Sequence, residues 1–344
     1  MLYFCSDGGG TKLQMLAFDE TLHLLSYAKG PAITTTYIPA EEVRRGLKAT
    51  LRQLIDGLPR PLPVGEDGRL LVDCLYQTSC FGLTPADALP AQAVLRRTVH
   101  IGEGPCGLLA GAGARTGILT LAGTGSDCFY IRDGREVRTV GGYGPVLGDE
   151  GSGYDLGRQA LLAAIHADEG RGEPTLLRDY VFADYGLKER MFELVAIVHG
   201  SPDSRKQVAR ATYTLGRAAR DGDAVAQRIL VRGGRRLAED TMALLRLIGE
   251  TPECTLPVTV SGGAWKIHPL LWNAYRTRLL QAYPHLALQA PPFDPVMAGV
   301  VQYVLETEGA LTPARLAQLK DAFAPCVLDS YFTPLPPQAL DGLQ

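Results

Sequence analysis

The sequence lacks several features that would each point to a particular class of protein. It has no run of about 18 apolar residues, so a membrane-spanning helix is not expected. It has no excess of positive charge, because 34 Lys and Arg stand against 37 Asp and Glu, for a net charge of −3. That balance leaves no basic footprint for nucleic acid or for anionic lipid. We therefore expect neither nucleic acid nor a membrane as a partner.

Cysteine is sparse and irregularly placed. The chain has seven cysteines, an odd number, and none of them forms a C-x-x-C pair. This argues against a disulfide framework and against a zinc site of the usual spacing. No signal-peptide pattern follows Met1. Reduced thiols in a cytoplasmic protein are the expectation.

No low-complexity linker divides the chain, yet its 344 residues suggest two domains. Two segments share one pattern, in which three short strands form a meander and a Gly/Thr/Ser turn joins the first two. Such a repeat indicates an internal duplication. The expected strands are 3–5, 13–18 and 22–28 in the first meander and 117–122, 128–131 and 136–140 in the second.

The remaining segments complete two α/β units. After the first meander we expect a helix from residue 40, strands over 70–76 and 97–101, and a helix over 108–114. After the second we expect a helical block over 152–250, a strand over 256–260 with a helix from residue 265, a strand near residue 286, and helices from residues 294 and 312. The predicted division is an N-terminal lobe over 1–115, a C-terminal lobe with a helical insertion over 116–310, and a helix and tail over 311–344.

One glycine pattern suggests a dinucleotide site. Gly102-Glu-Gly-Pro-Cys-Gly107 matches G-x-G-x-x-G between a strand-like and a helix-like segment, and Asp127 lies at about the distance of the usual acidic residue. However, an antiparallel meander follows where a second βα unit is needed, and Pro105 removes a backbone N–H from the would-be phosphate loop. We therefore disfavour a nicotinamide cofactor.

Two other turns share a design suited to phosphates. Asp7-Gly-Gly-Gly-Thr11 and Gly123-Thr-Gly-Ser126 combine glycines, which let backbone N–H groups approach an anion, with hydroxyl donors. Asp7 offers a carboxylate for Mg²⁺. Either turn alone would be interpreted as an ordinary hairpin connection. Their equivalent placement in two repeated units favours a phosphate clamp. The Walker A pattern is absent, so this is not a P-loop enzyme.

Two further segments add polar groups and bare backbone. The glycine-rich segment 141–153 contains the adjacent carboxylates Asp149 and Glu150 among Tyr, Pro, Val and Leu, a composition that predicts a packed loop holding its carboxylates. The segment 258–265 reads as a strand, a Gly-Gly turn and a helix. That turn is either a plain connection or a surface on which a flat ring can lie.

These segments together resemble the N-acetylglucosamine kinase and BadF-type ATPase group, within the superfamily of sugar kinases, actin and heat-shock chaperones. The resemblance runs in order from residue 3 to about 305, and the Gly-Asp-Glu-Gly-Ser segment is its most specific part. The matching segments are Asp7-Gly-Gly-Gly-Thr11, Gly123-Thr-Gly-Ser126, Gly141-Gly-Tyr-Gly144, Gly148-Asp-Glu-Gly-Ser152 and Ser261-Gly-Gly263.

The resemblance implies an α/β protein of two ribonuclease-H-like lobes, with ATP and a sugar in the cleft between them and Mg²⁺ near Asp7. It also implies sets of contact residues, and we expect a homodimer. The expected ATP contacts are Gly8, Gly9, Gly10, Thr11, Lys12, Gly123, Thr124, Gly125, Ser126, Gly262 and Gly263. The expected sugar contacts are Thr35, Thr36, Ser79, Asp127, Gly142, Asp149 and Glu150.

The sequence departs from the family pattern at two places. Where the family has an Asp that acts as base toward the sugar hydroxyl, at the start of a helix, this chain has Glu103. We expect Glu103 and Asp7 to be catalytic. Where relatives that bind N-acetyl sugars usually have an Asn, this chain has Thr34, Thr35 and Thr36. The acceptor is therefore expected to lack the acetyl group or to carry another substituent.

The predicted function is ATP-dependent phosphorylation of a sugar or amino sugar. One alternative is an ATPase activator of the BadF type, which couples ATP hydrolysis to electron transfer through a cysteine-held Fe–S cluster. No cysteine is flanked by glycines in the usual manner of cluster ligands; Cys106, the nearest candidate, lies between Pro105 and Gly107 and is only a weak match. The other alternative is a non-catalytic sensor or pseudokinase, which the Glu at the base position leaves open.

Overall fold

The computed structural model describes residues 1–10, 12–35, 38–78, 83–201 and 203–343. It forms two compact units, of which the first comprises Met1–Arg115, Asp133–Arg135 and Pro291–Leu328, and the second Thr116–Arg132, Glu136–Ala290 and Asp329–Gln344. The first segment of the first unit ends at Arg115. Near the C-terminus, residues 291–328 pack on the first sheet, and 329–344 belong to the second unit.

The first unit is built on a five-stranded mixed sheet. Its strands are β1 (Leu2–Gly8), β2 (Lys12–Asp19), β3 (Leu24–Pro31), β5 (Cys74–Thr78) and β7 (Thr98–Ile101). The spatial order is β3-β2-β1-β5-β7. The predicted antiparallel meander is confirmed in β1 to β3, and β5 and β7 add in parallel to β1.

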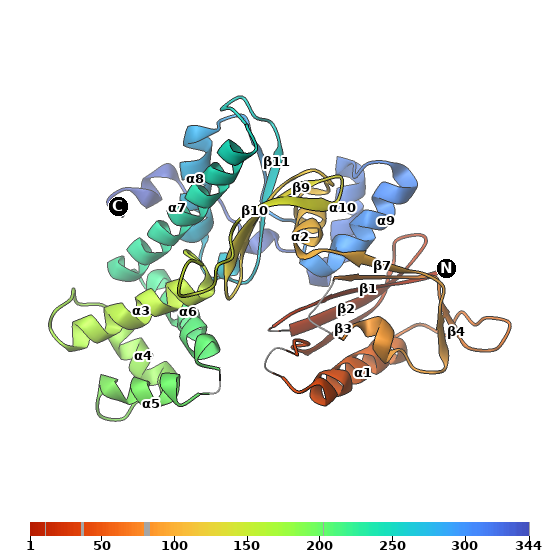
Figure 1. Ribbon diagram of the computed structural model, residues 1–344, viewed down its shortest axis with the longest axis horizontal. Coiled ribbons are helices and arrows are strands. Elements are labelled where there is room, and N and C mark those ends of the chain that lie inside the picture. Colours follow the sequence, from red (N-terminus) through yellow and green to blue (C-terminus); the bar gives the residue numbers. More distant parts are fainter. Residues whose placement is uncertain (11, 36–37, 79–82, 202, 344) are drawn as a thin grey trace. The chain divides into compact units, whose positions relative to one another are not determined.

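Helices cover both faces of this sheet (Figure 1). Successive side chains of β1 alternate between the faces. Leu2 and Phe4 enter the core shared with α1 (Ala40–Asp56). Tyr3 and Cys5 enter the core on the other face, shared with α2 (Glu103–Ala112), α9 (Ala298–Glu308) and α10 (Pro313–Ala322). Apolar side chains on both faces explain the nearly continuous apolar run of this strand.

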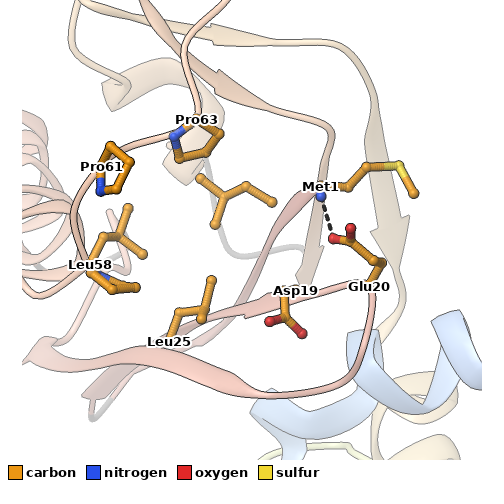
Figure 2. A pocket seen from close by; sticks show the side chains of 9 residues that line it. Met1, Asp19, Glu20, Leu25, Leu58, Pro61 and Pro63 are labelled. Carbon is orange, nitrogen blue, oxygen red and sulfur yellow. Dashed lines mark hydrogen bonds and ion pairs between the residues drawn. The ribbon is translucent and has the colours of Figure 1, made fainter.

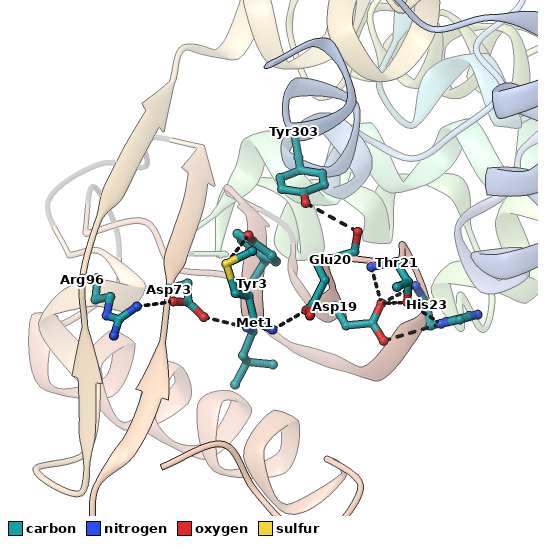
Figure 3. A network of polar contacts seen from close by, with 10 residues as sticks. Met1, Tyr3, Asp19, Glu20, Thr21, His23, Asp73, Arg96 and Tyr303 are labelled. Atoms are coloured by element: carbon teal, nitrogen blue, oxygen red, sulfur yellow. Dashed lines mark hydrogen bonds and ion pairs between the residues drawn. The ribbon is translucent and has the colours of Figure 1, made fainter. Parts of the chain in front are cut away.

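The predicted single strand over 70–76 is two strands, because the chain breaks at Asp73. β4 (Leu70–Val72) pairs with β6 (Ala93–Leu95), a strand the sequence did not predict, in a small separate sheet. The Asp73 carboxylate accepts hydrogen bonds from the Leu2 N–H at 2.8 Å and from Arg96 Nη1 at 2.9 Å. Figure 3 shows this network at the amino end of β1.

A cavity of about 190 Å³ lies beside the same end of the sheet (Figure 2). Its lining is mainly apolar and includes Leu25, Leu58 and Pro61, while the Met1 amino group pairs with Glu20 at its rim. Asp7 is at the opposite end of β1, about 20 Å away along the strand. The cavity is therefore no part of the edge that carries the predicted phosphate turn.

The second unit repeats the first sheet. Its strands are β8 (Gly117–Ala122), β9 (Ser126–Arg132), β10 (Arg135–Gly141), β11 (Pro257–Ser261) and β12 (Ala287–Leu288). Their order is β10-β9-β8-β11-β12, with β8 antiparallel to β9 and parallel to β11. The same order in both sheets agrees with the predicted duplication.

A buried hydroxyl cluster joins this sheet to its helices. Thr120 Oγ1 lies 2.7 Å from Thr241 Oγ1 and 2.9 Å from Tyr275 Oη, which links β8 to α7 (Ala224–Leu247) and α8 (Pro269–Ala282). Among the described residues, no helix has both the length and the apolar character needed to cross a bilayer. The helices of this unit are α3 (Gly153–Asp168), α4 (Leu177–Tyr185), α5 (Leu194–His199), α6 (Ser204–Arg220), α7 (Ala224–Leu247) and α8 (Pro269–Ala282).

Candidate active site

In the first unit, predicted catalytic residues gather at the carboxyl edge of the sheet. Asp7 lies near the end of β1, Thr78 ends β5, and Ile101, which is paired with Thr78, ends β7 two residues before Glu103. Thr78 Oγ1 donates to Asp7 Oδ1 at 3.1 Å. Because the three strands are parallel, their ends meet at one edge, where ligands bind in open α/β sheets.

Glu103 is the first residue of α2 and its side chain is exposed. The helix begins at residue 103, not at 108 as the sequence predicted, and Gly104 and Gly107 lie inside it. β7 is an edge strand and the next strand, β8, begins the other sheet. The G-x-G-x-x-G pattern is thus no dinucleotide loop, and it leaves a carboxylate at a helix start, where the dipole stabilises negative charge.

The first glycine turn has one face closed by packing and one left open. A Cβ on Gly8 would lie 2.4 Å from Ile33 Cδ1, whereas a Cβ on Gly9 would have nothing within 4 Å. The Gly9 N–H donates to the Lys12 carbonyl at 3.0 Å, and the Ile33 N–H donates to the Gly9 carbonyl at 3.1 Å. The turn is therefore held in shape with Gly9 open to a ligand.

The residues around Asp7 suit Mg²⁺. Gln14 is directly opposite Asp7 in the β1–β2 register, so both side chains lie on one face. Gln14 is 1% exposed, yet its Oε1 accepts no hydrogen bond from any described residue. Its Nε2 donates to Tyr27 Oη at 2.5 Å and lies 3.4 Å from Asp294 Oδ2. Carboxylate and amide oxygens are the donors that Mg²⁺ and its bound waters prefer.

Lys12, an expected ATP contact, lies at the start of β2. Its Nζ is 3.8 Å from Asp294 Oδ1, and its side chain is 51% exposed. The pair places a cation and a second carboxylate beside the first glycine turn. This cation remains accessible from solvent.

In the second unit, the turn 123–125 is fastened through its carbonyl groups. The Gly123 carbonyl accepts from the Gly153 N–H at 2.8 Å, and the Thr124 carbonyl accepts from the Tyr154 N–H at 3.1 Å, both at the start of α3. The Gly125 carbonyl accepts from the Gly123 N–H at 2.9 Å. All three carbonyl groups of the turn therefore already accept hydrogen bonds within the second unit.

The Gly262–Gly263 turn lies against this one, because β11 is paired in parallel with β8. Gly262 has φ +109°, and a Cβ there would lie 2.3 Å from the Ala122 carbonyl oxygen. At Gly263 a Cβ would meet nothing within 4 Å. Gly262 is thus required by packing, whereas the open backbone at Gly263 is where a flat ring has room.

Of the two carboxylates in the 149–150 pair, only Glu150 is exposed. Asp149 is 3% exposed, has φ +63°, and accepts from the Gly144 N–H at 3.2 Å and from Arg205 Nη2 at 2.9 Å. The expected sugar contact at Asp149 is therefore a buried anchor. Ser126 Oγ fixes the same loop by donating to the Glu150 carbonyl at 3.0 Å.

β9 begins at Ser126, two residues before the predicted strand start at 128, so Asp127 lies on this strand, opposite Leu121. A Cβ on Gly142, which has φ +75°, would lie 1.8 Å from Asp127 Oδ1, so only glycine fits beneath this carboxylate. Burial is the largest of the effects that raise the pKa of Asp127, and the negative charges of Asp149 and Glu136 raise it further. Arg205 acts in the opposite direction.

Asp240, on α7, extends this group of acids. Burial and the charges of Glu150 and Glu239 raise the pKa of Asp240 from 3.8 to about 6, against the opposing effect of Arg236. A carboxyl with a raised folded-state pKa favours the protonated protein. The contribution of Asp240 to stability is therefore complete below the pKa that this residue has in the unfolded chain, and it is lost as the pH rises through about 6.

Asp240→Asn is therefore expected to increase the free energy of unfolding by about 1 kcal/mol at pH 8, and by less at pH 5. Urea denaturation at the two pH values measures this. The same substitution at Asp56, which is exposed on α1, serves as the control and should change neither value. An Asp240→Asn stabilisation that is equal at both pH values would contradict the assignment of this pKa.

Several predicted contacts have other outcomes. Thr11, Thr36 and Ser79 lie outside the described residues. Thr34 is buried, whereas Thr35 is exposed. Sequence reasoning did not single out Thr78, Gln14 or Arg205. The first two are buried strand residues, and Arg205 follows Asp149 by 56 positions, so no local pattern marks any of them.

Several known proteins share sequence or fold with this chain. The chain is 28% identical over 307 residues to the N-acetylmuramic acid/N-acetylglucosamine kinase of Clostridium acetobutylicum, covering 86% of this chain and 95% of that relative. A provisionally named N-acetylglucosamine kinase from Porphyromonas gingivalis has a similar structure, with a TM-score of 0.63 and 20% identity over 90% of this chain and 99% of that one.

A ROK family glucokinase from Streptomyces griseus, solved with glucose and AMPPNP, superposes with a TM-score of 0.52 and 17% identity, covering 90% of this chain and all of that one. These structures share the fold, which confirms the predicted α/β class with two actin-like lobes. Residues 7–282 match the family model described as BadF/BadG/BcrA/BcrD ATPase family. The chain is a member of that ATPase family.

Proposed function

We propose that this protein transfers the γ-phosphoryl group of ATP to a hydroxyl of a sugar or amino sugar. The observation that supports this best is the repeated design of the two units. Each places a glycine turn between its first two strands, with carboxylates beside it, at the carboxyl edge of a like-ordered sheet. The kinase names of the Clostridium relative and the two structures support the same reaction class.

The residues divide the work as phosphoryl transfer requires, by positioning and charge neutralisation. The turn 123–125 binds phosphate through the N–H groups of Thr124 and Gly125, the first turn leaves space for a phosphate beside Gly9, and adenosine lies along Gly263. Asp7, with Gln14 behind it, holds hydrated Mg²⁺, which when bound neutralises phosphate charge. Asp127 and Glu150 accept hydrogen bonds from sugar hydroxyls.

Glu103 is proposed as the base. The acceptor oxygen bonds to the γ-phosphorus as the bond to the β–γ bridging oxygen breaks, and ADP leaves. The hydroxyl proton passes to the Glu103 carboxylate, which must lie within about 3 Å of the acceptor oxygen or reach it through one water. Its exposed position at the helix start leaves that carboxylate accessible to a substrate.

The acceptor preference is a test of this proposal. Thr34 is buried, so in the described part of the segment 34–36 only the Thr35 side chain is exposed to a substituent on the sugar. This segment has no Asn side chain to hydrogen-bond an N-acetyl group. We therefore expect kcat/KM for glucosamine or glucose to exceed that for N-acetylglucosamine by about 10-fold. A coupled assay of ADP formation over these sugars and N-acetylmuramic acid measures it.

The outcomes separate the hypotheses. Selectivity for an N-acetyl sugar would contradict the threonine inference and leave the kinase intact. ADP formation at the same rate with and without every sugar would favour an ATPase, as in the BadF-type activator. The six cysteines that the structure describes are buried, however, and buried thiols do not favour an Fe–S cluster held at the protein surface. Nucleotide binding without turnover would favour a sensor or pseudokinase.

A further inference from the structure

Arg205 lies in the first turn of α6 and is not among the residues assigned to the proposed reaction above. Its Nη2 donates to the buried Asp149 at 2.9 Å. The same nitrogen lies 2.8 Å from where a Cβ on Gly125 would be, so the guanidinium rests directly on the second glycine turn. The side chain is 46% exposed, and its Nε and Nη1 donate to no described residue.

Asp149 holds this guanidinium in place. The carboxylate is buried, its other oxygen accepts the Gly144 N–H, and its backbone is in the left-handed region at φ +63°. An arginine tethered by one nitrogen retains several donors in a planar array, which suits two oxygens of one phosphate. The tether lowers the entropy lost when such a ligand binds.

The turn beneath the guanidinium presents donors and few acceptors. All three carbonyls of 123–125 accept hydrogen bonds within the unit. The N–H groups of Thr124 and Gly125 and the Thr124 hydroxyl have no partner among the described residues, and Thr124 is exposed. Unpaired N–H groups with their carbonyls occupied form an anion-binding nest. Arg205 adds a full positive charge beside it.

We propose that Arg205 binds the γ-phosphoryl group of ATP together with the 123–125 turn. This inference rests on the proposed kinase function. The γ-phosphate is the phosphate nearest to the acceptor, and Arg205 lies beside both the phosphate turn and Asp149, one of the carboxylates of the expected sugar site. It touches Asp149, and its charge acts on Asp127. A cation in this position stabilises the charge of the transferring group.

The test compares two nucleotides. Titration calorimetry measures the Kd of ADP and of AMPPNP for the wild type, Arg205→Gln and Arg205→Lys, alongside kcat with the best acceptor. Arg205→Gln is expected to weaken AMPPNP by about 10-fold or more while ADP changes less than 3-fold, because charge-assisted hydrogen bonds to one phosphate are lost. The kcat should fall by about 100-fold. Arg205→Lys should recover part of both.

Arg217 provides a matched control on the same helix. Its Nη1 pairs with Asp184 Oδ1 at 3.1 Å, and its side chain is 42% exposed. Arg217→Gln should leave the ratio of the two Kd values unchanged. An unchanged ratio in Arg205→Gln, or an equal loss of both nucleotides with a lower Tm, would overturn the inference. Failure of the wild type to bind either nucleotide would instead overturn the proposed function, and this inference with it.

If Arg205→Gln does not fold, the lysine variant decides the question. It retains the charge and can keep the ion pair with Asp149, but it cannot bind two phosphate oxygens through a planar fork. A selective loss of AMPPNP affinity in Arg205→Lys supports the proposal. Wild-type affinity for both nucleotides and a wild-type kcat in this variant contradict it.

Discussion

Glu103→Gln is expected to lower kcat by about 10²–10⁴ while the affinities for nucleotide and acceptor persist. The amide keeps the size of the side chain and its ability to hydrogen-bond, but it cannot take the acceptor proton. Glu103 is exposed at the start of α2, so the change should not affect the core. Steady-state kinetics with the preferred sugar, together with nucleotide titration, separates kcat from binding.

Two further variants test whether the loss of kcat is specific to the Glu103 carboxylate and depends on its reach. Glu103→Asp shortens the side chain by about one methylene, and partial recovery of kcat would show that reach limits the rate. Glu42→Gln alters an exposed Glu in the first turn of α1 and should leave kcat unchanged. A Glu103→Gln enzyme with wild-type kcat would exclude Glu103 as the base.

The second large effect is expected at neighbouring glycines with opposite surroundings. Gly262→Ala should destabilise the protein by about 3 kcal/mol, because alanine is strained at φ +109° and its Cβ would meet the Ala122 carbonyl oxygen at 2.3 Å. Gly263→Ala should leave stability unchanged, since its Cβ would have nothing within 4 Å. Thermal and urea unfolding measure both.

Nucleotide titration of Gly263→Ala then tests the adenosine position. If the ring lies along this backbone, the added methyl group should weaken ATP by about 10-fold in a fully folded protein. Unchanged ATP affinity would remove adenosine from Gly263. A large loss of stability in Gly263→Ala would contradict the observation that a Cβ at Gly263 has nothing within 4 Å.

Short apolar segments separated by turn residues predicted both meanders, because short-range backbone preferences determine hairpins. The break at Asp73 was missed, since it depends on the Leu2 N–H and on Arg96, which are distant in sequence. The start of α2 was placed five residues late because its first residues include glycine and proline.

The sequence alone determined the family, the duplicated α/β design, and the Asp and Glu placed at strand ends, since all three depend on contiguous segments. Tertiary structure decided what each of these residues does. It buried Asp149 and left Glu150 exposed, set Gly262 against a carbonyl and Gly263 in the open, and brought Arg205 onto a turn 80 residues earlier in the chain. Burial and contact between distant segments are properties of packing, and no local pattern of residues encodes them.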